Sequence, residues 1–257
     1  MSTFKLNLLI GLSIMDLPAL HQAATDKNIA KLKELVSTGV DINERAKNGS
    51  SALFYAAQAD CMECVKFLID SGADVNVANK IGGTALNRAA ENGNIAMMEF
   101  LFDNGAIIGN LALILAAREG HLKAVRLLLE KGADVNATQP WGQTALMQAA
   151  REGHAGVIQL LIKSGADIKM RDKNGKSALT MANDNDHPEI SMYLKRAGAV
   201  EDKIKKKPSP APVQDDDDDD DDDDLSATTE EIVPDDADAD EMSDDEEEDI
   251  DDDRLRD

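Results

Sequence analysis

Residues 142–167 read GQTALMQAAREGHAGVIQLLIKSGAD. In this stretch a leucine and an alanine pair are followed by Gly-His, an apolar run and a closing Ser-Gly-Ala-Asp. Alanine pairs let two short helices approach closely, and apolar residues at helical spacing favour one buried face on each helix. The closing glycine suits a position after a helix that needs a positive φ. The stretch therefore predicts two packed helices followed by a turn-rich loop.

The same features recur along the chain with a fixed period. The closing glycines are separated by steps of 33, 33, 27 and 33 residues: Gly39, Gly72, Gly105, Gly132 and Gly165. The leucines near the helix starts keep the same period: Leu20, Leu53, Leu86, Leu113, Leu146 and Leu179. This period predicts a stack of two-helix units, each of which buries its apolar face only against a neighbour. Such a stack offers an extended surface and no enclosed catalytic pocket.

Further landmarks fall at fixed offsets in several copies. The signature Gly-Ala-Asp-Val-Asn occurs twice, at residues 72–76 and 132–136. Alanine pairs recur at residues 23–24, 56–57, 89–90 and 116–117. In these features the chain resembles the ankyrin repeat family, in about six copies over residues 18–199. The resemblance implies an all-α ankyrin-repeat solenoid of helix-turn-helix units with β-hairpin-like loops, and a role in binding proteins.

Two departures from the family pattern carry expectations of their own. Alanine stands before the leucine in place of proline at four positions: Ala52, Ala85, Ala145 and Ala178. We expect less sharply specified helix starts and a moderately stable solenoid, because proline favours the first helical position and restricts the unfolded chain. The second departure is the short step, in which Gly105 to Leu113 takes eight residues where other repeats take 14.

The six missing residues are those that project as a hairpin finger in other repeats. We therefore expect a notch in the surface between the third and fourth repeats. Two interpretations remain open. The first is a neutral loop deletion, because loops tolerate changes in length. The second is a notch that admits a side chain or loop of a partner.

The residues before the first repeat are mostly apolar. Residues 4–15 read FKLNLLIGLSIM, but they lack a small-x-small cleavage site and are too short to span a bilayer. We predict an N-terminal leader or cap over residues 1–17, with a secretory signal as the alternative. The terminal repeats depart from the Gly-His landmark, as expected for repeats that shield the ends of a core.

The charge of the chain is concentrated in its C-terminal segment. The chain carries a net charge of −23, and residues 215–257 contain 27 acidic and 2 basic residues. Residues 1–214 therefore carry a net charge of +2. The uninterrupted run from Asp215 to Asp224 repels itself and lies among too few apolar residues to fold. We predict a disordered acidic tail over residues 215–257.

A basic, proline-rich linker is predicted over residues 200–214. Its lysine cluster at 203–207 can fold back on the acidic tail or serve as a nuclear-import signal, although short basic runs are widespread. Ser209 lies between two prolines and suits a proline-directed kinase, while Ser243 precedes acidic residues and suits an acidophilic one. Both serines are phosphorylation candidates.

Three roles are open for the acidic tail. It can be a solvated segment that solubilises or autoinhibits. It can be a docking surface for a basic protein such as a histone tail or a ribosomal protein. It can also bind calcium weakly and diffusely, because it lacks the spaced ligands and turn glycine of a defined loop. Direct binding of nucleic acid is disfavoured because phosphates repel the carboxylates.

The cysteines and histidines of the repeats, which could carry chemistry, have structural explanations. Cys61 and Cys64 have C-x-x-C spacing without a second pair to complete a zinc site, and we predict reduced, packed thiols. The four histidines fall at repeat landmarks, and the resemblance implies that His121 and His154 tie neighbouring loops. No nucleophile–base–acid set or phosphate-binding glycine loop occurs, so we predict no enzymatic activity, no metal site and no cofactor.

Trp141 is the only tryptophan of the chain and follows Pro140 at the tip of a finger. An exposed ring there is a candidate anchor, whose truncation costs about 2 kcal/mol of binding free energy. The alternative is a ring folded back on the adjacent finger, since tryptophan is usually well buried. The register places further candidates on the concave face: Lys47, Asn48, Lys80, Ile81 and Gln143 from the hairpins, and Gln58, Glu91, Asn92, Arg118, Glu119, Arg151 and Glu152 from the inner helices.

Two Arg-Glu dipeptides recur at the same place in adjacent repeats, at 118–119 and 151–152. They form either a ladder of exposed ion pairs, each worth little, or a mixed-charge stripe that recognises a partner of alternating charge.

The sequence as a whole predicts a non-enzymatic protein-binding module or adaptor whose tail modulates binding or recruits a basic partner. We expect a monomer in the cytoplasm or nucleus, with a protein partner on the concave face and no direct contact with nucleic acid or membrane. The alternative function is that of an acidic-tail chaperone or buffer of polycations such as histone-like or ribosomal proteins.

Overall fold

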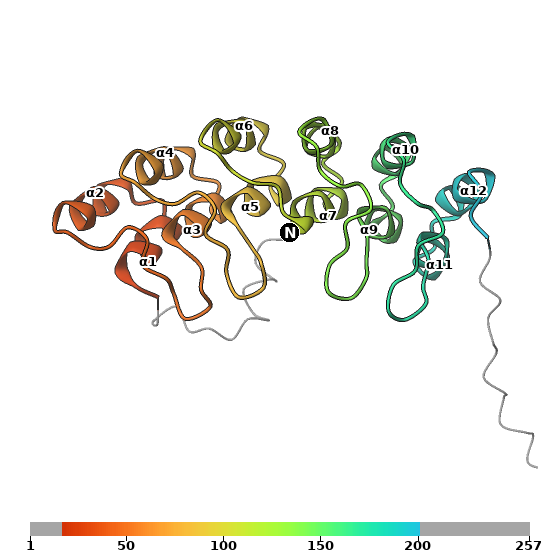
Figure 1. Cartoon of the computed structure of the whole chain (residues 1–257), viewed down its shortest axis with the longest axis horizontal. Coiled ribbons are helices and arrows are strands. Elements are labelled where there is room, and N and C mark those ends of the chain that lie inside the picture. Colours follow the sequence, from red (N-terminus) through yellow and green to blue (C-terminus); the bar gives the residue numbers. More distant parts are fainter. Residues whose placement is uncertain (1–16, 201–257) are drawn as a thin grey trace, which may run out of the picture. The chain divides into compact units, whose positions relative to one another are not determined.

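The computed structural model describes residues 17–200, and every structural statement below concerns that part of the chain. Helices follow one another in pairs joined by short turns, and this range contains no strand. The odd-numbered helices form one row of the stack and the even-numbered helices form a second row (Figure 1). This is the all-α repeat stack that the periodicity predicts.

The first helix of each pair belongs to the odd-numbered row. Its members are α1 (Ala19–Thr25), α3 (Ala52–Gln58), α5 (Ala85–Glu91), α7 (Asn110–Arg118), α9 (Ala145–Glu152) and α11 (Ala178–Asp184). The even-numbered row consists of α2 (Ile29–Ser37), α4 (Met62–Asp70), α6 (Ile95–Asp103), α8 (Leu122–Glu130), α10 (Ala155–Lys163) and α12 (Pro188–Arg196).

The core lies between the two rows and continues from repeat to repeat. The alanine pairs of the odd-numbered helices are almost completely buried, as are the periodic leucines. Each even-numbered helix buries one stripe, such as Val125 and Leu128 on α8. Because removal of apolar surface from water is the main driving force of folding, each repeat depends on its neighbours for stability.

Serine or threonine side chains start four of the odd-numbered helices. Ser51, Thr84, Thr144 and Ser177 occupy the N-cap, and each side-chain oxygen accepts the backbone N–H three residues further on. This bond satisfies an N–H that the helix leaves unpaired. These helices therefore keep a side-chain cap although alanine stands at their first helical position, and the prediction that alanine specifies the helix start less sharply than proline stays a prediction. Helix α7 has no side-chain cap, since its N-cap is Gly109.

Four long loops, here called fingers, connect an even-numbered helix to the next odd-numbered helix. They are finger A (residues 38–51), finger B (71–84), finger C (131–144) and finger D (164–177). Each tip is a turn closed by two backbone hydrogen bonds, and each contains a glycine of positive φ, such as Gly82 at 79°. Other residues rarely adopt that conformation, so the turn requires glycine there.

The junction between α6 and α7 has no finger. The connecting loop spans only residues 104–109, whereas each finger spans 14 residues. Helix α7 also begins three residues before its periodic leucine, while α3, α5, α9 and α11 begin one residue before theirs. In Figure 1 the long loops of fingers B and C, which lead into α5 and α9, flank α7 in space, whereas the loop that joins α6 to α7 is short. The short sequence step is therefore a lost finger.

Several predictions concern residues outside the described part of the chain. These are most of the leader at 1–17, nearly all of the basic linker, the acidic tail at 215–257, and the candidate phosphorylation sites Ser209 and Ser243. The helices from Ala19 to Arg196 lie within the repeat region predicted at 18–199. The domain boundaries themselves stay predictions.

Candidate functional site

The predicted interaction residues form two groups at opposite ends of the odd-numbered helices. One group lies at the finger tips, which precede these helices: Lys47, Asn48, Lys80, Ile81, Trp141 and Gln143. The other group lies at or next to their C-terminal ends: Gln58, Glu91, Asn92, Arg118, Glu119, Arg151 and Glu152. A helix of seven residues is about 10 Å long, so the two groups do not form one cluster. We call the surface made by the fingers and the odd-numbered helices the finger face.

Two finger tips expose large apolar side chains. Trp141 is 66% exposed and Ile81 is 73% exposed. The indole is therefore not buried against an adjacent finger, and its role as an anchor stays a prediction. Both residues occupy the same register position, where fingers A and D carry Asn48 and Asn174.

Other predicted tip residues hold the shape of their own finger. The Asn48 amide donates to the Tyr55 hydroxyl at 3.0 Å. The Gln143 side-chain oxygen accepts from the amides of Gln139 and Gln148. These interactions give Asn48 and Gln143 structural roles that the repeat register did not reveal.

A backbone hydrogen bond joins neighbouring fingers in two places. The Lys80 N–H donates to the Asn48 carbonyl at 3.0 Å between fingers A and B, and the Lys173 N–H donates to the Trp141 carbonyl at 3.0 Å between fingers C and D. Fingers B and C have no such bond. Within residues 17–200, no N–H donates to the Ile81 carbonyl. The lost finger thus leaves one backbone acceptor without its usual partner.

An open cleft of about 510 Å³ lies between fingers B and C. We call it the BC cleft. Its lining residues are Ile81, Gly82, Asn110, Leu111, Thr138, Gln139 and Pro140. The cleft lies where the missing residues predict a notch, and none of the lining side chains is charged.

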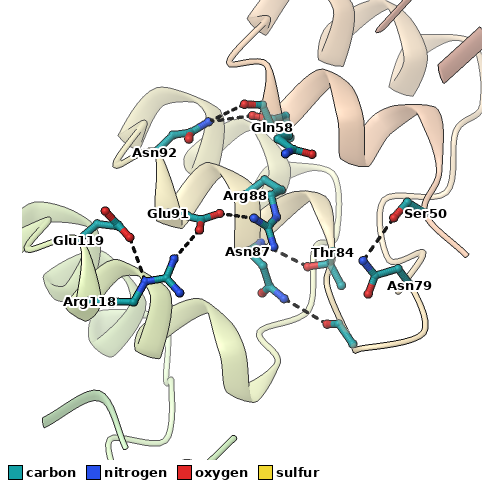
Figure 2. A network of polar contacts seen from close by, with 12 residues as sticks. Ser50, Gln58, Asn79, Thr84, Asn87, Arg88, Glu91, Asn92, Arg118 and Glu119 are labelled. Atoms are coloured by element: carbon teal, nitrogen blue, oxygen red, sulfur yellow. Dashed lines mark hydrogen bonds and ion pairs between the residues drawn. The ribbon is translucent and has the colours of Figure 1, made fainter. Parts of the chain in front are cut away.

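A polar network crosses the same junction at the other end of the helices (Figure 2). The Glu91 carboxylate forms ion pairs with Arg88 and with Arg118, the latter at 2.6 Å. Arg118 also contacts Glu119 at 2.9 Å, and the Arg88 guanidinium lies 5.0 Å from the centre of the Phe54 ring. Arg88 is not among the predicted residues, although its spacing of three residues from Glu91 on a helix is typical of an ion pair.

The remaining predicted residues of this group make local contacts. The Asn92 amide donates to the carbonyls of Ala57 and Gln58 in the preceding repeat, at 2.9 and 3.4 Å (Figure 2). Arg151 and Glu152 form an ion pair at 2.8 Å. Both Arg-Glu dipeptides therefore form the ion pairs of the simpler alternative. Recognition of a partner by these residues stays a prediction.

Histidines link successive repeats through backbone carbonyls. His121 Nε2 lies 2.9 Å from the Glu91 carbonyl oxygen, and His154 and His187 make the equivalent contact one and two repeats further on. The linking role that the family resemblance implies for His121 and His154 is confirmed.

His21 has a related but more buried position. Its Nε2 lies 3.0 Å from the Ser50 carbonyl oxygen, and its buried Nδ1 has no hydrogen-bond partner. Burial lowers the pKa of His21 below its ordinary value of 6.5, against the smaller opposing effects of the Ser50 hydrogen bond and of Glu44. The ring is therefore neutral near pH 7 and donates from Nε2.

The two cysteines differ from the prediction. Cys61 is the N-cap of α4, Cys64 lies in its first turn, and their sulfur atoms form a disulfide. The prediction of reduced thiols is wrong for this structure, because the start of the helix places the two Cα atoms 5.3 Å apart, within reach of a disulfide. Cys61 is the N-cap of α4 at the place where His121 is the N-cap of α8.

Two further classes of site are not found in residues 17–200. That range contains no cluster of His, Cys, Asp or Glu that could hold a metal ion. None of its helices is long and apolar enough to cross a membrane. The finger face has two exposed apolar tips, a backbone carbonyl at Ile81 that accepts no N–H from residues 17–200, and the uncharged BC cleft.

Comparison with known proteins agrees with the repeat geometry. The model of the ankyrin repeats, in three copies, matches residues 20–111, 63–139 and 113–206, so the chain belongs to the ankyrin repeat family. No curated protein matches the chain.

A solved structure shares this fold. It is the complex of the predatory endopeptidase Bd0816 from Bdellovibrio bacteriovorus with immunity protein Bd3460. One of its chains is 30% identical to this one, with a TM-score of 0.62. The match covers 70% of this chain and 98% of that chain.

Proposed function

We propose that this chain is a non-enzymatic adaptor, monomeric on its own, that binds a partner protein through its finger face. The observation that carries the proposal is the exposure of Trp141 and Ile81 at finger tips, where neither side chain has a role in packing. Aromatic residues are enriched in protein interfaces and among their hot spots. The 30% identical chain belongs to a complex of two proteins, which supports a protein as the ligand.

Capture of partners by three proteins tests this proposal. The full chain, Trp141→Ala and Met192→Ala are used as baits in cell extract, and captured proteins are quantified by mass spectrometry. Met192 is 54% exposed but lies on α12 in the even-numbered row, so its truncation is a matched control on another surface. We expect Trp141→Ala to lose about 2 kcal/mol of binding free energy, or roughly 30-fold in affinity.

The outcomes separate the finger face from the rest of the molecule. Loss of a protein from the Trp141→Ala sample alone supports the proposal. Equal capture by all three baits contradicts the finger face as the binding surface. Equal loss with Met192→Ala indicates a general effect on folding, which circular dichroism of both variants measures directly.

We also propose that residues 215–257 recruit a basic partner or modulate binding at the finger face. The support is their charge, with 27 acidic and 2 basic residues. Poly-lysine is a suitable probe, since attraction to such a segment is electrostatic and screened by salt. We expect the full chain to bind poly-lysine at low salt and residues 1–200 not to bind it. If the isolated tail is enough for salt-sensitive histone binding and the finger-face variants lose no partner, the polycation chaperone is the better description.

The compartment is a further part of the proposal. The lysine cluster at 203–207 supports the cytoplasm or nucleus, whereas the Cys61–Cys64 disulfide is more typical of an oxidising compartment. Fractionation of cells combined with thiol alkylation decides between them. Nuclear or cytoplasmic protein with both thiols alkylated supports the proposal, and a secreted, disulfide-bonded protein contradicts it.

A further inference from the structure

The two fingers beside the BC cleft depart from the pattern of the other two. Their equivalent tip residues are Ile81 and Trp141, where fingers A and D have Asn48 and Asn174. Ile81 and Trp141 are also the large apolar side chains exposed on the fingers. A neutral loop deletion gives no reason for apolar residues to be confined to the tips that border the gap.

The backbone of finger C is adapted to the absence of a preceding finger. In the finger register Pro140 corresponds to Lys80 and Lys173, whose N–H groups donate to the finger before them. Proline has no N–H, so finger C carries no unused donor at this position. Finger B still presents the Ile81 carbonyl, which accepts no N–H from residues 17–200. The cleft therefore has the Ile81 carbonyl as a hydrogen-bond acceptor on the side of finger B and the apolar ring of Pro140 on the side of finger C.

Leu111 adds apolar surface to the cleft, beside the uncharged polar side chains of Asn110, Thr138 and Gln139. Leu111, in the first turn of α7, is half-buried and lies beneath finger B, because a Cβ atom added to Gly82 would be 3.9 Å from its Cδ1. A volume of about 510 Å³ lies in the range of small binding pockets and accommodates a short loop with one large side chain.

We propose that the BC cleft binds a loop of the partner protein, which takes the place of the absent finger. The loop donates a backbone N–H to the Ile81 carbonyl, as Lys80 does to Asn48, and places a large apolar side chain between Ile81 and Pro140 over Leu111. This proposal rests on the proposed function and adds the structural class of the ligand. An uncharged apolar side chain fits because no lining residue carries a charge that would pair with an ionised one.

Three variants of the full chain test the cleft. In the filled variant, residues 104–111 are replaced by the 14-residue sequence of finger B, which restores the 33-residue period and puts a finger into the gap. In Ile81→Asn, the tip takes the residue of fingers A and D. The matched control is Asn174→Ala, an exposed tip residue of finger D away from the cleft. Circular dichroism and thermal unfolding check the fold of each variant.

The probe is a phage-displayed library of random 12-residue peptides, selected on the full chain. Binding of the enriched peptides is measured through the fluorescence of Trp141, the only tryptophan of the chain, which adjoins the cleft. We expect the enriched peptides to contain a large apolar residue. Their affinity for Ile81→Asn should be lower than for the full chain by about tenfold or more, they should not bind the filled variant, and their affinity for Asn174→Ala should be unchanged. A blue shift of the emission is expected on binding.

The outcomes distinguish this inference from the proposed function. Peptides that bind the filled variant and Ile81→Asn as well as the full chain overturn the cleft. They leave the finger face as a binding surface if Trp141→Ala, which lacks tryptophan and is therefore measured by calorimetric titration, binds them more weakly. Failure to enrich any peptide overturns the cleft, and the capture experiment then decides the proposed function independently. Concentration-dependent dimers of the full chain that the filled variant does not form also overturn it, because the occupant is then a second copy. If the filled variant does not fold, the affinities of the peptides for Ile81→Asn and for Asn174→Ala are compared, and equal affinities overturn the cleft.

Discussion

At the scale of single residues, most side chains that recur with the repeat period have partners in the next repeat. Glu91, Asn92 and His154 each bridge neighbouring units. A period in the sequence does not separate this role from ligand binding, because a contact between identical units produces the same spacing as a repeated contact with a partner. Trp141 and Ile81 differ, since they interrupt the pattern of tip residues.

The buried ring of His21 predicts a pH dependence of stability. Its folded-state pKa lies below 6.5, so the unfolded chain takes up the proton first as the pH falls. The contribution to the free energy of unfolding is therefore complete above pH 6.5 and is lost as the pH falls from 6.5 towards the folded-state pKa. Urea unfolding at pH 7.5 and pH 5.0 should show a smaller decrease for His21→Gln than for the unmodified chain, by up to about 1.4 kcal/mol per pH unit. An equal decrease in both proteins contradicts the role of His21.

The Glu91 network predicts unequal effects for two similar substitutions. Glu91→Gln removes charge from a carboxylate that pairs with Arg88 and Arg118 and is only 15% exposed. Glu119→Gln removes charge from a side chain that is 43% exposed and pairs with Arg118 alone. We expect a loss of about 1 kcal/mol or more in the free energy of unfolding for Glu91→Gln and less than about 0.5 kcal/mol for Glu119→Gln. Equal losses in denaturant unfolding would show that the network does not stabilise the junction.

At the scale of elements, side-chain caps mark the starts of four odd-numbered helices that lack a proline at their first position. The capping serines and threonines precede the helix by one residue, and their signal is visible in the sequence once the helix start is known. The end of each pair is specified in the same local way, because the closing glycines adopt positive φ, as Gly132 does at 91°. The start of the first helix and the end of the second helix in a pair are therefore predictable from local chemistry.

Thr144 provides a test of the cap. Its hydroxyl oxygen accepts the Met147 N–H at 3.3 Å, and the residue is buried. Thr144→Ala should lower the free energy of unfolding by about 1 kcal/mol, because the N–H of α9 loses its partner. Ser164→Ala is the control, since this exposed serine at the C-cap of α10 should change stability by less than about 0.5 kcal/mol. Similar midpoints in thermal unfolding for the two variants would exclude the cap as the cause.

At the scale of the whole molecule, the unit formed by α7 and α8 has fewer hydrogen bonds to its neighbours than the other units have. Asn43, Asn76 and Asn136 each donate to a glycine carbonyl in the next repeat, but the equivalent position of the short loop is Gly109, which has no side chain to donate. That bond would join this unit to the repeat after it, whereas the donor missing at the Ile81 carbonyl would join it to the repeat before, so at least one hydrogen bond is missing on each side. Stability in repeat proteins is approximately a sum of terms for each unit and each interface.

Hydrogen exchange measures this difference. We expect amides of α7 and α8 to have opening free energies about 1 kcal/mol or more below those of the flanking pairs α5–α6 and α9–α10, since a hydrogen bond is missing on each side of this unit. In the filled variant the discontinuity should disappear. Exchange that progresses evenly from the two ends, with no lower protection in α7 and α8, contradicts the weakened unit.

The sequence by itself determined the repeat class, the two-helix unit, the location of the lost finger and the separation of a nearly neutral repeat region from an acidic tail. These depend on local propensity and on a period that every copy repeats. The tertiary structure alone decided that Glu91 lies between two arginines, that the cysteines form a disulfide, that Trp141 is exposed, and that Ile81 and Pro140 face one cleft. Each of these depends on how neighbouring units place their backbones and side chains in space. The spacing of residues along the chain does not specify the distances between side chains of different units.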